Sequence, residues 1–325
     1  MPEKIVLQLP EGMKPLSIKI ADCIRQKCPG AKIYIHGDPS YGACDLSYPE
    51  LEYYLTPDLI IHVGHTPYPP ELASKKSTPQ GKTRVIYITA ESRLDVNENL
   101  LEDLVRFIEK YDSSNIGVVG TIQHYRLIPK IVRWLNKHGY NASTSPARTP
   151  YFVEGQVLGC EYGSALMLKS DLYVYVGGGL FHPLGLYLAT MKPVIKLDPY
   201  HQKVEDLTPY GEKTYKKRMY KIMQAMNAKH WGLVLGLKTG QYRPWLEKQL
   251  SSLLISKGVK YDVFLFEKLT IESLRSLPQE IDAYVVTSCP RLPIDDLADF
   301  EKPVLTPGEA VMALTGKLER YRFPW

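Results

Sequence analysis

The sequence of 325 residues lacks the signatures of membrane and secreted proteins. No run of about 18 apolar residues occurs, so a membrane-spanning helix is not expected. The first ten residues enter a strand-like run without the basic segment, apolar stretch and small-residue cleavage site of a secretion signal. These absences predict a cytoplasmic protein that is not attached to a membrane. A chain of this length can also fold around its own core, which excludes a disulfide-stapled miniprotein.

Cysteine is scarce, and the five cysteines at positions 23, 28, 44, 160 and 289 are an odd number spread along the chain. Thiols or metal ligands are therefore expected rather than disulfides. The common local motifs are missing too: there is no C-x2-C ribbon, G-x-G-x-x-G, P-loop, H-E-x-x-H or G-x-S-x-G. No common local motif therefore identifies a metal or cofactor site.

Neither sign of charge dominates: 40 lysines and arginines stand against 35 aspartates and glutamates, which leaves a small positive net charge of +5. This excess is too small for a dedicated nucleic-acid binder, and direct nucleic-acid binding is not expected. Hydrophobic residues make up 44% and charged residues 23%, as in ordinary globular proteins. The composition thus excludes disorder and coiled coil.

The chain repeats itself three times with a period near 110 residues. Each third opens with a short apolar run, continues with a helical pattern that has one apolar face, and then has an aspartate-led strand and a fourth apolar run. The opening runs are 5–9, 116–120 and 233–236; the aspartate-led strands are 58–63, 171–176 and 282–286; the fourth runs are 85–88, 194–197 and 303–305.

Continuously apolar strands separated by helices are typical of parallel sheets covered on both faces. We therefore predict an α/β fold of three similar domains with mainly parallel sheets in a pseudo-threefold, triplicated arrangement. The predicted limits are 1–112, with Cys44; 113–228, with Cys160; and 229–325, with Cys289. Segment 201–228 is expected to be a long surface helix that links the second and third domains.

A cysteine follows a strand in each third, at the edge where functional loops of parallel sheets lie. Cys44, Cys160 and Cys289 have glycine or proline nearby, which favours turns. A single cysteine is usually a small buried hydrophobe, and Cys23 and Cys28, around the end of the first helix, are interpreted in that way. Three strand-end cysteines instead predict metal ligation at a common centre.

Three thiolates suit two kinds of metal centre. Zinc would need a fourth donor, which His65 or His182 could supply. An iron-sulfur cluster would keep one iron without a protein ligand, and that iron could hold a small molecule through its amine and carboxylate. The residue pattern leaves both open.

Other strand-end residues are candidates for binding a ligand. The loop 236–241 could bind an anion at a helix start or be a plain turn, and 177–183 requires close backbone approach to a ligand or a neighbouring domain. His65 and Arg291 stand at strand ends, where a structural role competes with substrate contact.

Several motifs together resemble the archaeal diphthamide biosynthesis enzymes, the 2-(3-amino-3-carboxypropyl)histidine synthases of subunit 2 type. The resemblance covers essentially the whole chain, and the cysteine order and spacing match the family's three cluster ligands. The motifs are Leu9-Pro-Glu-Gly12, Gly37-Asp38, Tyr41-Gly-Ala-Cys-Asp45, His-Val-Gly-His at 62–65, Leu158-Gly-Cys160, Phe181-His182 and Thr287-Ser-Cys-Pro-Arg291.

The resemblance implies a homodimeric, non-conventional radical enzyme with one 4Fe-4S cluster per chain on Cys44, Cys160 and Cys289. S-adenosylmethionine would be the co-substrate, and an electron from a donor not identified by the sequence would cleave its bond between sulfur and the γ-carbon. The 3-amino-3-carboxypropyl radical would add to a histidine of translation elongation factor 2 and release methylthioadenosine. His65, Gly240, Gln241 and Arg291 are expected to seat S-adenosylmethionine; no catalytic residue beyond the cluster is assigned.

Two alternatives stay open. A quinolinate-synthase-like enzyme would use a three-cysteine cluster as a Lewis acid, although the residues around the cysteines fit that family poorly. A zinc-stabilised scaffold would have no activity and would contain zinc without iron.

Overall fold

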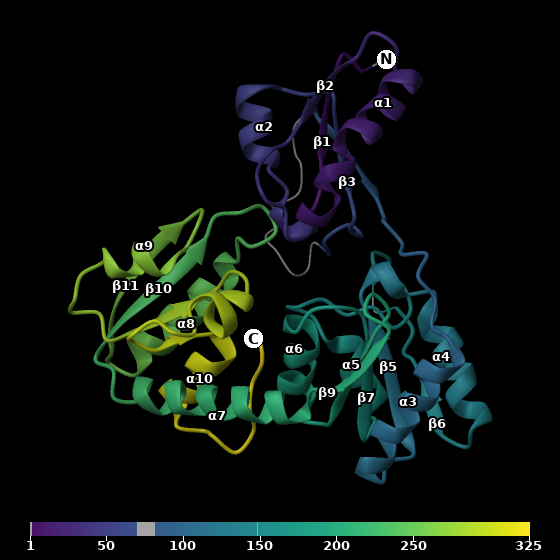
Figure 1. Ribbon diagram of the computed structural model, residues 1–325. Coiled ribbons are helices and arrows are strands. Elements are labelled where there is room, and N and C mark those ends of the chain that lie inside the picture. The colour runs from purple at the N-terminus through teal and green to yellow at the C-terminus, as the bar shows by residue number, and fades with distance from the viewer. Residues whose placement is uncertain (1, 70–81, 148) are drawn as a thin grey trace. The chain divides into compact units, whose positions relative to one another are not determined.

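Three sheets, built mainly of parallel strands, form the framework of the chain, whose computed structural model describes residues 2–69, 82–147 and 149–325 (Figure 1). The first sheet contains β1 (Lys4–Gln8), β2 (Lys32–Ile35), β3 (Leu59–Val63) and β4 (Arg84–Ile88). The second contains β5 (Asn115–Gly120), β6 (Asn141–Ser143), β7 (Leu172–Val176), β8 (Val194–Asp198) and β9 (Lys203–Asp206). The third contains β10 (His230–Gly236), β11 (Lys260–Phe266), β12 (Ala283–Val286) and β13 (Val304–Leu305).

The three sheets share one strand order: the second strand of the repeat lies at an edge, followed by the first, third and fourth. Ladders between these strands are parallel, apart from β9, which extends the second sheet antiparallel to β8. The predicted α/β class and triplicated, mainly parallel sheets are confirmed. The pseudo-threefold arrangement in space stays a prediction.

An aspartate ahead of the third strand of the repeat holds the start of the first strand. The Asp58 carboxylate accepts hydrogen bonds from the backbone N–H groups of Glu3 (2.7 Å) and Lys4 (2.9 Å). Asp282 does the same for Lys229 (2.9 Å) and His230 (3.0 Å) in the third repeat. Bonds to the charged form lower the pKa of Asp58, those from Lys4 and Glu3 being the main cause. The repeated aspartate thus has a structural role in the first and third repeats.

Helices lie on both faces of the sheets. Helices α1 (Ser17–Lys27) and α2 (Tyr48–Tyr54) belong to the same unit as the first sheet. The second is packed by α3 (Glu98–Ile108), α4 (Leu127–Lys137), α5 (Gly163–Leu168) and α6 (Phe181–Thr190). The third carries α8 (Pro244–Ser256), α9 (Ile271–Arg275) and α10 (Pro307–Thr315), and α7 (Thr208–Ala225) lies between the second and third sheets in the sequence.

Strand β7 shows how one strand supplies two cores. Leu172, Val174 and Val176 pack into the cluster beneath α3 and α4, whereas Tyr173 and Tyr175 pack into the cluster with α5 and α6. Side chains of a strand alternate between its faces, so a strand buried on both faces is continuously apolar. Both sides of the second sheet are therefore covered, as the sequence predicts.

Two compact units are formed, and their limits differ from the predicted domain limits. Residues 1–91 and 237–243 make the first unit, and residues 92–236 and 244–325 make the second. Helix α3, expected in the first domain, packs on β8 and β9 because its apolar face joins the core of the second sheet. The loop 237–243, expected in the third domain, is held by hydrogen bonds to the segment after β2. The three predicted domains otherwise stay a prediction.

Helix α7 packs on α6 and α10 and so joins the second and third sheets in one unit (Figure 1). It is shorter than the predicted helix over 201–228, because Lys203–Asp206 pair with β8 as strand β9. Its fully buried Arg218 forms an ion pair with Glu309 of α10 (Nη2–Oε2 2.6 Å). The same guanidinium donates to the carbonyls of Pro293 (2.7 Å) and Val304 (2.7 Å). These bonds compensate the cost of burying both charges.

Candidate functional site

Cys44 lies in a short 3-10 turn, Ala43–Asp45, on the connection that leaves β2. The loop after β10, which belongs to the same unit, closes on it. The N–H of Gly240 donates to the Cys44 carbonyl (2.9 Å), and the Thr239 hydroxyl donates to the carbonyl of Leu46 (2.8 Å). Lys238 pairs with the Asp45 carboxylate (Nζ–Oδ1 2.6 Å). Cys44 is thus positioned by a segment almost 200 residues further along the chain.

Gly240 and Gln241 lie against Cys44 itself. A Cβ atom on Gly240 would stand 2.7 Å from the Cβ and 2.9 Å from the carbonyl oxygen of Cys44, so a larger residue does not fit without movement. The amide Nε2 of Gln241 lies 3.8 Å from the Cys44 sulfur. The sequence predicts these two residues to seat S-adenosylmethionine; their observed contacts are with the first cysteine.

His65 follows β3 and joins a buried chain of polar groups in the same unit. Its Nδ1 lies 2.9 Å from Nε2 of His62, whose own Nδ1 lies 3.1 Å from Oε1 of Gln8. Gln8 in turn donates through Nε2 to the carbonyl of Asp45 (3.0 Å). This chain connects His65 to the turn that contains Cys44.

Both histidines of this chain are neutral at pH 7. Burial, followed by the neighbouring His65, lowers the pKa of His62 to about 3. Burial also lowers the pKa of His65 to about 4, although the Asp45 carboxylate acts in the opposite direction. A neutral imidazole has one donor and one acceptor nitrogen, and its hydrogen-bond partners decide which nitrogen carries the proton.

Cys160 and Cys289 both belong to the second unit, and both act electrostatically on the same buried residue, Tyr162. Both lie close enough to the buried phenol of Tyr162 that their charges, after burial and the neighbouring Tyr175, raise its pKa well above the ordinary value. The Tyr162 hydroxyl donates to the carbonyl of His182 (3.1 Å). Two of the three predicted cluster ligands therefore lie near one buried tyrosine.

Arg291 also belongs to the second unit and precedes a π-helical turn, Leu292–Asp296. Its Nε lies 3.3 Å from Asp295 and its Nη2 lies 3.4 Å from Asp296. The side chain is 39% exposed, so this pairing is weak and a ligand carboxylate can compete for the guanidinium.

The interpretation of the remaining two cysteines as small buried hydrophobes is wrong for Cys23, because its position on α1 faces away from the core, and it holds in part for Cys28. Cys23 is exposed on α1, and Cys28 packs against the core of the first sheet directly after that helix. All five cysteines lie in the described ranges, and none of them forms a disulfide. Within either unit taken by itself, the described residues hold no group of three or more Cys, His, Asp or Glu side chains placed to bind a metal. The predicted three-cysteine set draws on both units.

Gln8 and His62 were not identified as site residues from the sequence. The signal that marks them is a polar residue inside a continuously apolar strand, since both have no exposed surface. A buried polar group needs a partner, so two such residues on neighbouring strands indicate a buried hydrogen bond. Lys238 and Asp45 carry no comparable signal, because their pairing joins segments distant in sequence.

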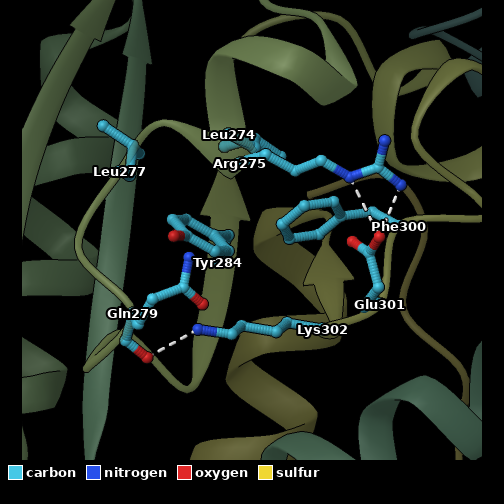
Figure 2. Close-up of a pocket in the computed structure, with 8 residues that line it drawn as sticks. All are labelled: Leu274, Arg275, Leu277, Gln279, Tyr284, Phe300, Glu301 and Lys302. Carbon is cyan, nitrogen blue, oxygen red and sulfur yellow. Dashed lines mark hydrogen bonds and ion pairs between the residues drawn. The ribbon is translucent and has the colours of Figure 1, made fainter.

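A cavity of about 290 Å³ lies elsewhere, at the amino ends of β12 and β13 (Figure 2). Tyr284 and Phe300 line it, together with Arg275, Glu301 and Lys302. Arg275 pairs with Glu301, and Lys302 donates to the carbonyl of Gln279 (2.7 Å). Since Cys289 follows the carboxyl end of β12, this cavity is separate from the predicted site.

Among the described helices, none is long and apolar enough to cross a bilayer.

Comparison with known proteins gives the family. The sequence model of the diphthamide synthesis protein family matches residues 9–322. The 2-(3-amino-3-carboxypropyl)histidine synthase of Pyrococcus horikoshii is 32% identical over 99% of this chain and 88% of its own length, and that of Methanocaldococcus jannaschii is 28% identical over 98% and 86%. The crystal structure of Dph2 from Pyrococcus horikoshii with a 4Fe-4S cluster superimposes with a TM-score of 0.84 at 31% identity, covering 99% of this chain and 89% of that one.

The family model and the relatives match over nearly the whole length of the chain, and the fold agrees with that of the solved relative. The chain belongs to the diphthamide synthesis protein family, and it is an enzyme of the 2-(3-amino-3-carboxypropyl)histidine synthase class.

Proposed function

We propose that this chain carries out the first step of diphthamide synthesis, the transfer of the 3-amino-3-carboxypropyl group of S-adenosylmethionine to a histidine of translation elongation factor 2. The observation that carries the proposal is that Cys160 and Cys289 lie near the same buried tyrosine, Tyr162, in a fold that superimposes on a relative crystallised with a 4Fe-4S cluster. Cys44 completes a set of three thiols, each partly buried.

The donor set fits an iron-sulfur cluster. Thiolates are the usual ligands of such clusters, and three of them leave one iron for a substrate. Cys44, Cys160 and Cys289 would hold the cluster. When bound, it supplies the electron that cleaves the bond between the sulfur and the γ-carbon of S-adenosylmethionine.

The residues of the chain would position the cluster ligands and the substrate. Gly240 and Gln241 keep Cys44 in place, and Tyr162 ties the Cys160 segment to the start of α6. Lys238 neutralises Asp45 beside the first cysteine. His65, Gly240, Gln241 and Arg291 remain our candidates for seating S-adenosylmethionine. Correct placement of reacting groups accounts for a large part of enzymatic rate enhancement.

The partners that we propose are those that the family resemblance implies. The protein substrate is elongation factor 2, an electron donor reduces the cluster, and the working form is a homodimer in the cytoplasm. Methylthioadenosine is the small product.

The test is an anaerobic preparation analysed for iron and sulfide, then supplied with dithionite and S-adenosylmethionine. About four irons per chain and release of methylthioadenosine support the proposal. Alanine in place of Cys44, Cys160 or Cys289 is expected to abolish both, whereas Cys23→Ala serves as the matched control and retains them. Iron without cleavage would favour a Lewis-acid enzyme, and zinc in place of iron would exclude the radical reaction.

A further inference from the structure

The buried chain Asp45–Gln8–His62–His65 fixes which nitrogen of His65 is a hydrogen-bond acceptor. The carbonyl of Asp45 can only accept, so the group of Gln8 that faces it at 3.0 Å is the amide NH2. The other end of that amide, Oε1, can only accept, so the Nδ1 of His62 at 3.1 Å carries the proton. The orientation of Gln8 is thereby set by a backbone group of the Cys44 turn.

The same donor and acceptor argument applies to His65. A neutral His62 with its proton on Nδ1 has a lone pair on Nε2, which accepts from the Nδ1–H of His65 at 2.9 Å. His65 is neutral as well, so its Nε2 is an acceptor. Gln8 and His62 are fully buried and His65 is partly exposed, so the acceptor is at the end of the chain that solvent and ligands can reach.

This chain orients a group and does not conduct protons. A glutamine amide neither gains nor loses a proton near neutral pH, so transfer cannot pass through Gln8. What the chain does is exclude the other tautomer of His65, whose Nε2–H would be a donor.

S-adenosylmethionine offers two very different polar groups on its amino acid moiety. The carboxylate can only accept hydrogen bonds, whereas the ammonium group can only donate. A neutral Nε2 acceptor matches the ammonium group and gives nothing to the carboxylate. The Asp45 carboxylate also acts on the His65 ring in the sense that favours positive charge there.

We propose that Nε2 of His65 accepts a hydrogen bond from the α-ammonium group of S-adenosylmethionine, and that Gln8 and His62 are positioning residues that hold His65 in the tautomer this requires. The inference rests on the proposed function and deepens it, because it assigns the substrate group that one residue recognises and two residues beyond the ligand that enforce the recognition.

The test compares S-adenosylmethionine with its deamino analogue, in which hydrogen replaces the amino group, by calorimetric titration of the anaerobic holoenzyme. The wild-type protein is expected to bind S-adenosylmethionine roughly 10- to 100-fold more tightly, as for one hydrogen bond to a charged group. His65→Ala and His62→Phe should lose most of this preference, and His65→Gln, which keeps an acceptor oxygen, should restore part of it. His36→Ala, a histidine elsewhere in the same unit, should keep it.

A second measurement reads the tautomer directly. In the full-length protein labelled with ¹⁵N-histidine, His65 should show the shift pattern of an imidazole protonated on Nδ1, and His62→Phe or Gln8→Met should weaken it. A preference for S-adenosylmethionine that survives His65→Ala, or a His65 protonated on Nε2, overturns the inference while methylthioadenosine formation still supports the proposed function. A wild-type holoenzyme that neither binds nor cleaves S-adenosylmethionine overturns both.

Discussion

Gly240→Ala is a substitution for which the structure predicts a direct effect of a single methyl group on Cys44. The added Cβ would lie 2.7 Å from the Cβ of Cys44, whereas an ordinary contact begins near 3.4 Å, so one of the two loops must move by at least 3.4 − 2.7 = 0.7 Å. The clash includes the backbone of Cys44, which cannot turn aside as a flexible side chain can. The turn that carries the first predicted cluster ligand must therefore be displaced.

Two contributions set the size of the effect. Overpacking of a close contact costs about 1–3 kcal/mol, and the hydrogen bond from the Gly240 N–H to the Cys44 carbonyl contributes about 1 kcal/mol that movement would weaken. We expect a loss of ~2–4 kcal/mol in the free energy of unfolding of the first unit. A displacement of this size also exceeds the ~0.5 Å within which functional groups must be held.

The assay combines urea unfolding with iron content per chain and methylthioadenosine formation. Gly240→Ala is expected to lose most of its bound iron and at least about tenfold of its activity, since tenfold corresponds to only 1.4 kcal/mol. Gly37→Ala in the same unit is the control, because a Cβ there meets nothing within 4 Å. If Gly240→Ala binds iron fully and unfolds like the wild type, the close packing of this loop on Cys44 is refuted.

Three other predictions concern stability. Arg218→Ala should lower the free energy of unfolding by about 3–5 kcal/mol, because it leaves the Glu309 carboxylate buried and unpaired; a urea midpoint within error of the wild type would contradict this. Leu104→Ala, fully buried in the core of the second sheet, should cost about 2–5 kcal/mol in the same experiment. The pKa of His62 is lowered from 6.5 to about 3, so between these pH values the unfolded chain binds a proton that the folded chain does not. The free energy of unfolding should therefore decrease below pH 6.5, by up to ~1.4 kcal/mol per pH unit. In urea unfolding at several pH values, His62→Phe should reduce this slope.

The repeats were readable from the sequence because their signals are local. Apolar strands such as 116–120 and 171–176 recur at a fixed spacing, and continuous apolarity already indicates coverage on both faces. The sequence did not predict which sheet α3 covers, because an apolar helix face does not specify the sheet on which it packs. Only the tertiary structure shows that α3 packs on the second sheet.

The candidate site was predictable in part for the same reason. Strand-end positions mark Cys44, Cys160 and Cys289, since loops beyond parallel strands carry function. The partners of those residues were not predictable. Gln241 looks like a ligand-binding residue in its loop, and only the fold shows that its amide lies beside the sulfur of Cys44.

By itself, the sequence determined the fold class and the triplication, because hydrophobic periodicity is a property of neighbouring residues. It also marked three cysteines, whose role as ligands stays a prediction. Tertiary structure decided that the loop 237–243 closes on Cys44, and that Gln8, His62 and His65 form one hydrogen-bonded chain. These features join segments almost 200 residues apart, and they depend on distances of 2.9 to 3.1 Å between polar groups, which hold only if the packing places those groups to within a few tenths of an ångström. Such distances are set by packing, which no local pattern of residues encodes.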